Sequence, residues 1–140
     1  METKKIPTET FLEEELREID LSVVDDYPSF DACDSLYENV ARENCFENRL
    51  VSHFYGIFAT KNMVVEKALL DTIWIELAIS EKGVPLIKNL KISDSVRTAI
   101  PKMEGWIYGG LDSLPKINPA IKRGIPVRTS FTIPVVIEVN

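Results

Sequence analysis

The sequence predicts an α+β domain: two layers, with a three-stranded antiparallel sheet carrying two helices on one face, preceded by an N-terminal extension. Apolar residues recur at helical spacing in two segments and alternate at strand spacing in three others. These segments follow one another in the order helix, strand, strand, helix, strand. Helices that share one face of a sheet bury the apolar sides of both layers. At 140 residues, the chain has the length of one domain and buries enough surface to fold without a disulfide or metal.

Residues 1–18 are predicted to form an acidic tail or linker, and residues 19–140 the domain itself. Residues 1–43 contain 13 Asp and Glu against 4 Lys and Arg, whereas residues 44–140 contain 9 against 12. The small positive excess of the second part is too dilute to follow a phosphate backbone, which argues against nucleic-acid binding. Between residues 19 and 44 we expect a short extended piece and then a loop with room for one helical turn.

The first helix is predicted over residues 45–59, with Asn44 as its N-cap. Its apolar stripe recurs every four residues at Phe46, Leu50, Phe54 and Phe58. A strand follows over residues 73–79, where apolar side chains occupy every second position. Gly83 closes a hairpin turn because glycine accepts the left-handed conformation. The return strand then points three residues inward: Leu86, Leu90 and Ile92.

The second helix is predicted over residues 101–114, after a connection at residues 93–100, because Pro101 suits a first helical position. Within it, Gly110 is expected to allow a close approach to the sheet. The segment 127–139 has the strongest strand pattern, with inward positions at Val127, Thr129, Phe131, Ile133, Val135, Ile137 and Val139. Paired with the first strand it lies at the sheet edge, and Pro134 agrees because proline in strands is confined mostly to edges and bulges.

The chain lacks the sequence motifs of the common nucleotide-binding, hydrolase and metalloprotease classes. Ser113 and Lys116 have the Ser-x-x-Lys spacing, but Pro115 ends the helix between them. His53 is the only histidine, and packing at the edge of a core explains its position. We therefore predict a non-catalytic protein without cofactor or metal, and an unrecognised hydrolase that uses His53 is the least favoured hypothesis.

Two cysteines, Cys33 and Cys45, lie twelve positions apart. A disulfide between them is sterically allowed and would suit an oxidising compartment, whereas two free buried cysteines are the alternative. The residues alone do not choose between these two states.

The exposed edge also has two interpretations. Its main-chain N–H and C=O groups could pair with an added strand, or Pro134, Arg128 and Glu138 could protect it from unwanted pairing. An edge of this length also allows a homodimer.

The stretch LPKINPAIKRGIPVRTSFTIPVVIEV resembles the closing part of the C-terminal domains of TonB, the energy transducer of the bacterial envelope. The segment IWIELAISEKGVPLIKNLKI is similar to the hairpin of that family. Upstream, VVDDYPSFDAC followed by NCFENRLVSHF resembles an envelope-specific branch of it. The likeness covers residues 19–140 and is most specific in the C-terminal half.

The resemblance implies a periplasmic protein-binding domain that couples inner-membrane energy to transport. Its partner would be an extended segment of a TonB-dependent outer-membrane receptor, bound beside the last strand. The side chains expected at that site are Arg128, Ser130, Thr132, Val136 and Glu138. The family's membrane anchor and proline-rich spacer are not found in this chain, so it is either an excised domain or a free-standing relative. The alternative function is a free-standing envelope adapter or regulatory domain with another protein partner.

Overall fold

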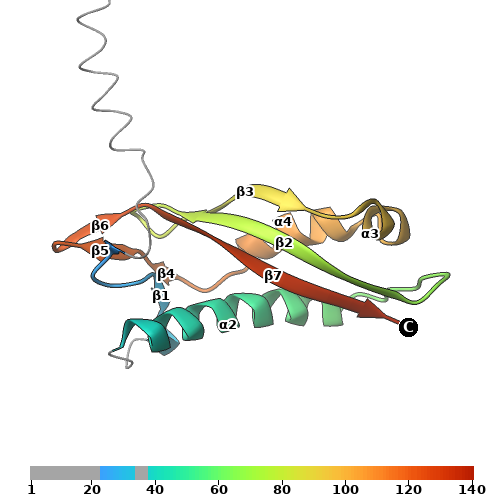
Figure 1. The fold of residues 1–140 in the computed structure, drawn as a ribbon, viewed down its shortest axis with the longest axis horizontal. Helices are drawn as coiled ribbons and strands as arrows, with labels where there is room; N and C mark the ends of the chain where they lie inside the picture. The colour runs from blue at the N-terminus through green and yellow to red at the C-terminus, as the bar shows by residue number, and fades with distance from the viewer. Residues whose placement is uncertain (1–22, 34–37) are drawn as a thin grey trace, which may run out of the picture.

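The computed structural model describes residues 23–33 and 38–140, which form an α+β fold (Figure 1). A three-stranded antiparallel sheet has the order β3-β2-β7. Its strands are β2 (Leu69–Ile79), β3 (Pro85–Lys91) and β7 (Thr129–Val139). The predicted α+β class, the three-stranded antiparallel sheet and the edge position of the last strand are therefore confirmed, whereas the described residues form three helices and not the predicted two. The acidic tail predicted over residues 1–18 lies outside the described residues and stays a prediction.

The described residues form three α-helices, α2 (Asn39–Ala59), α3 (Asp94–Ala99) and α4 (Met103–Asp112). The predicted start of the first helix is wrong, since α2 begins six residues before Cys45 and Asn44 lies inside it. No breaker interrupts residues 39–44, and Arg42 in this first turn pairs with Asp26 at 2.8 Å. A tertiary ion pair thus favours helix where the local pattern suggested a cap.

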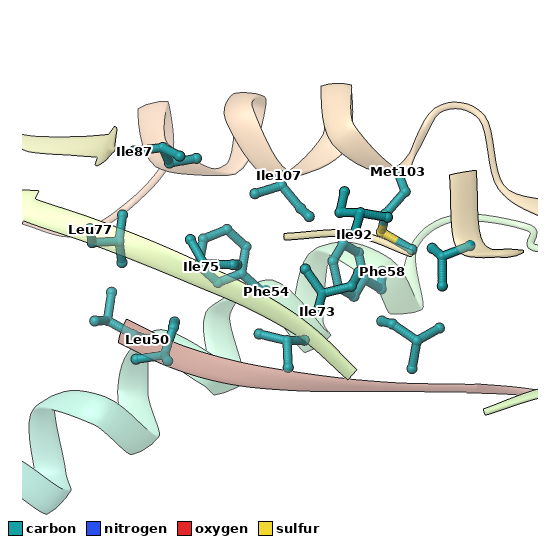
Figure 2. Close-up of a cluster of buried hydrophobic side chains, with 14 of the residues drawn as sticks. Leu50, Phe54, Phe58, Ile73, Ile75, Leu77, Ile87, Ile92, Met103 and Ile107 are labelled. Atoms are coloured by element: carbon teal, nitrogen blue, oxygen red, sulfur yellow. The ribbon is translucent and has the colours of Figure 1, made fainter. Parts of the chain in front are cut away.

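The core lies between one face of the sheet and the helices. Figure 2 shows Ile75 and Leu77 of β2 near Phe54 of α2 and Ile107 of α4. Helix α2 packs against β7 and α4 packs against β3, while the two helices also contact each other. The inward residues of all these elements belong to one buried cluster, so the domain has a single core.

A β-bulge at Lys88 inverts the alternation predicted for the return strand. Glu76 pairs with Asn89 and Leu77 pairs with Ile87, so Lys88 is the extra residue of β3. Ile87 is buried and Leu86 is exposed, which corrects the predicted inward position of Leu86. An unbroken alternation would have placed the Lys88 ammonium in the core, and the bulge places it 3.6 Å from the Glu76 carboxylate instead.

Helix α3 occupies the segment predicted as a connection. The Ser93 hydroxyl accepts a hydrogen bond from the Val96 N–H at 3.2 Å, which is a normal N-cap contact. The same hydroxyl donates to the Asp71 carboxylate at 2.6 Å and so ties α3 to β2. Serine followed by Asp94 is a capping signal, and it could have identified this helix from the sequence.

Gly110 allows a close approach between α4 and α2, not between α4 and the sheet as predicted. A Cβ atom at this position would lie 2.7 Å from Ile57 Cδ1 and 3.1 Å from Phe54 Cε1. The neighbouring Gly109 has no atom within 4 Å of the same position. Gly110 therefore faces side chains of α2, whereas Gly109 faces open space.

Short paired segments close one end of the fold. Strand β1 (Ser29–Phe30) pairs with β4 (Ile117–Asn118), and β5 (Ala120–Lys122) pairs with β6 (Ile125–Val127). A 3-10 turn, η2 (Asp31–Cys33), leads from β1 toward α2. The predicted turn at Gly83 is confirmed by its φ of 81°, and its backbone lies against the Ile117 carbonyl.

We predict that G110V destabilises the fold by about 2 kcal/mol more than G109V, because only the side chain at position 110 overpacks the helix contact. The two variants make the same change in the same helix, so the difference in helix propensity cancels. Urea denaturation of both variants and the wild type measures the free energies of unfolding. Equal losses in the two variants would contradict the close contact.

We also predict that S93A lowers stability at neutral pH by about 1 kcal/mol through loss of the N-cap. The pKa of Asp71 is lowered by the hydrogen bond from Ser93 and then by the one from the Thr72 N–H. A lowered folded pKa means that this carboxylate stabilises the fold above its unfolded pKa and less as the pH falls through its folded pKa. Unfolding measured from pH 7 to pH 3 should show the gap between wild type and S93A narrowing below about pH 4. A constant gap would exclude the coupling to Asp71.

Candidate functional site

The candidate site is the outer side of β7, where the three-stranded sheet ends. All eleven residues of β7 pair with β2, from Thr129 opposite Ile79 to Val139 opposite Leu69. Figure 1 shows β7 along the margin of the sheet with α2 running beside it. One side of the strand is therefore committed to β2, and the other side faces α2 and solvent.

The register of β7 with β2 shows which residues of β7 direct their main-chain N–H and C=O groups away from β2. In an antiparallel pair, hydrogen-bonded and non-hydrogen-bonded residue pairs alternate. Pro134 has no N–H and lies opposite Trp74, and the Val136 N–H bonds to a side chain of α2 instead of β2. The even-numbered residues therefore direct their N–H and C=O groups to the free side, and among the predicted site residues these are Ser130, Thr132, Val136 and Glu138.

The structure thus brings together four of the five predicted site residues. The fifth, Arg128, is half-buried and lies between β6 and β7, outside the strand. The predicted strand of residues 127–139 is divided here, because Val127 pairs with Ala120 in the small hairpin while Thr129 pairs with Ile79. Arg128 lies between β6, which pairs with β5, and β7, which pairs with β2, so its predicted position on the edge strand was wrong.

Tyr55 of α2 belongs to the site although the sequence did not indicate it. Its hydroxyl oxygen accepts a hydrogen bond from the Val136 N–H at 2.9 Å. Tyr55 lies one position after the buried Phe54, so its ring flanks the apolar stripe and its polar end reaches the sheet margin. A tyrosine beside a helix stripe is a weak signal, because the sequence does not show which element the helix margin approaches.

A groove of about 620 Å³ runs between the end of α2 and the C-terminal half of β7. Its walls combine Tyr55, Phe58 and Met63 with the last residues of the strand. The apolar groups can contact side chains, and the main chain of Glu138 faces the same space. The groove has room for side chains of an extended segment placed along the edge.

The outer face of the sheet beside this edge exposes apolar side chains. Leu70, Trp74 and Val136 are 71%, 44% and 46% exposed. Trp74 lies opposite Pro134 in the register of β2 and β7. These side chains offer apolar contacts next to the main-chain groups of the edge.

The structure also brings His53 and Ser113 together, which the sequence treated separately. His53 Nε2 lies 3.0 Å from both the Ser113 hydroxyl and the Gly110 carbonyl, and the hydroxyl also donates to that carbonyl at 3.1 Å. A carbonyl only accepts hydrogen bonds, so the contact with Gly110 requires the tautomer with its proton on Nε2, and that tautomer donates to Ser113 instead of accepting from it. The contacts join α2 to the C-terminal end of α4, and the absence of catalysis stays a prediction.

The sulfur atoms of Cys33 and Cys45 form a disulfide, one of the two states that the sequence left open. The bond joins η2 to α2, and Cys33 is completely buried. It therefore attaches the N-terminal elements to the helix that carries Tyr55.

Within residues 23–33 and 38–140, no group of three or more His, Cys, Asp or Glu side chains could hold a metal ion. None of the described helices has the length and apolar character needed to cross a membrane. Comparisons with protein-family models, curated proteins and solved structures found no match.

We predict that replacing both cysteines by alanine lowers stability by about 3 kcal/mol, the chain-entropy value for a loop closed by cysteines 12 positions apart. Thermal unfolding with and without reductant measures the loss, and the reductant should leave the double variant unchanged. Two reactive thiols in the denatured, unreduced protein would contradict the bond.

Proposed function

We propose that the chain is a non-catalytic protein-binding domain of the TonB C-terminal type. It captures an extended segment of a TonB-dependent outer-membrane receptor by strand addition and so couples inner-membrane energy to transport. The observation that carries the proposal is the edge position of β7, with the main-chain groups of Ser130, Thr132 and Val136 directed away from β2. The resemblance of residues 114–139 to that family suggests the class of partner.

Strand addition suits the chemistry of this edge. A partner strand supplies the C=O and N–H groups that pair with the N–H and C=O groups directed outward by β7, while side chains provide selectivity. The groove beside Phe58 and Met63 and the exposed Trp74 offer apolar contacts on the two sides of such a strand. A catalytic role has no comparable support, because the contacts of His53 with Gly110 and Ser113 are those of a residue that joins α2 to the end of α4.

The pairing of β7 with β2 also suits a domain under load. A pull along β7 would act on its full ladder with β2, and several hydrogen bonds would have to break together. The central strand β2 is joined on its other side to β3, so force would spread through the sheet. This geometry supports a role in pulling on a bound segment.

The proposal locates the domain in the periplasm. Disulfides persist in oxidising compartments such as the bacterial periplasm and are rare in reducing ones. The Cys33–Cys45 bond is consistent with that location.

The function can be tested with synthetic peptides that copy the N-terminal extended segments of outer-membrane receptors from the same genome. We predict that such a peptide shifts NMR amide signals of residues 127–139. T132P should weaken binding at least tenfold, because it removes an outward N–H without removing a bond to β2. T132A is the matched control, because it also removes the threonine side chain but keeps the outward N–H, so it should bind more tightly than T132P.

Preserved NMR spectra of both variants would show that the fold is intact. Peptide-induced shifts confined to the surroundings of His53, or equal binding by T132P and T132A, would overturn strand addition. Binding at β7 by segments of other envelope proteins, but not by receptor segments, would instead favour an adapter role.

A further inference from the structure

We infer that Tyr55 is a displaceable cap on the β7 edge, whose hydroxyl a partner strand must replace before it can pair with the strand's C-terminal half. This inference rests on the strand addition proposed above. It identifies a residue of α2, outside the sheet, that sets the affinity of the edge.

The hydroxyl occupies the place of a partner's carbonyl oxygen. The distance from the Val136 nitrogen to the Tyr55 oxygen is 2.9 Å, which is also the usual N–H···O=C distance between paired strands. One N–H group cannot make two such bonds at full strength. A strand that pairs along β7 past Pro134 therefore competes directly with Tyr55.

The surroundings of Tyr55 allow it to leave while the helix stays in place. Phe54 and Phe58 are buried in the core on the same helix and hold its backbone against the sheet. The Tyr55 side chain itself is 40% exposed and lines the open groove. Rotation about its side-chain bonds therefore moves the hydroxyl away from Val136 without opening the core.

The cap also explains how the C-terminal half of the edge is protected when no partner is bound. Pro134 removes one outward donor, and Tyr55 engages the next one along the strand. An incoming segment gains less from pairing here than it would at a bare edge. The expected reduction in affinity is about three- to tenfold, the usual net effect of one hydrogen bond.

The test compares the wild type with Y55F, which removes the hydroxyl and keeps the ring. Y108F is the matched control. It also removes a tyrosine hydroxyl, but Tyr108 is exposed on α4, away from β7. The probe is the acetylated octapeptide amide Glu-Thr-Val-Thr-Val-Thr-Val-Lys, an extended segment without a receptor sequence. NMR measures hydrogen exchange of the Val136 amide, the location of binding and the dissociation constant.

We expect Y55F to speed exchange at Val136 and to bind the octapeptide three- to tenfold more tightly, while Y108F matches the wild type. Equal affinity of Y55F and wild type for the edge would overturn the cap and leave strand addition intact. Failure of the octapeptide to bind at β7, together with failure of the receptor peptides, would overturn the proposed function and the inference with it. Unchanged exchange at Val136 in Y55F would overturn the cap by itself.

Discussion

The antiparallel ladder between β2 and β7 joins eleven residue pairs, from Ile79 and Thr129, 50 positions apart in the chain, to Leu69 and Val139, 70 positions apart. It sets β2 as the central strand and turns every second residue of both strands toward the helices. A shift of β7 by one residue would move Ile133 and Val135 from the core face to solvent while Ile73 and Ile75 of β2 stayed in the core. The positions of α2, α4 and the sheet edge all depend on this register.

The same ladder creates the exposed edge and determines its chemistry. Since Pro134 forms a pair with Trp74 that needs no main-chain bond, the strand continues through a residue that would interrupt a central strand. Its missing donor falls on the outer side, next to the N–H that Tyr55 engages. The edge can therefore be protected from unwanted pairing and still bind a partner. It keeps outward N–H and C=O groups that a partner strand can pair with, but the partner has to compete with Tyr55 for the Val136 N–H.

Helix α2 links the core to this edge. Its buried face fills the core, its flank carries Tyr55, and its N-terminal half is held by the disulfide to Cys33 and by the ion pair between Arg42 and Asp26. The close contact at Gly110 fixes α2 against α4 on the other side. The Tyr55 hydroxyl can compete with a partner only if α2 stays close to β7. The disulfide, the ion pair and the contact at Gly110 hold the backbone of α2 in that position.

The sequence by itself determined the elements whose periodicity is long and regular: the stripe of α2, the alternation of β2 and β7, the turn at Gly83 and the edge position of the last strand. It also placed Ser130, Thr132, Val136 and Glu138 at outward positions of the last strand, because alternation separates inward from outward positions. Only the tertiary structure decided the features that depend on contacts with residues distant in the chain. The early start of α2 involves Asp26, the bulge at Lys88 follows from keeping a charge out of the core, and Arg128 left the edge strand because Val127 pairs elsewhere. Tyr55 could not be assigned to the site because its position beside Val136 arises only when α2 packs along β7.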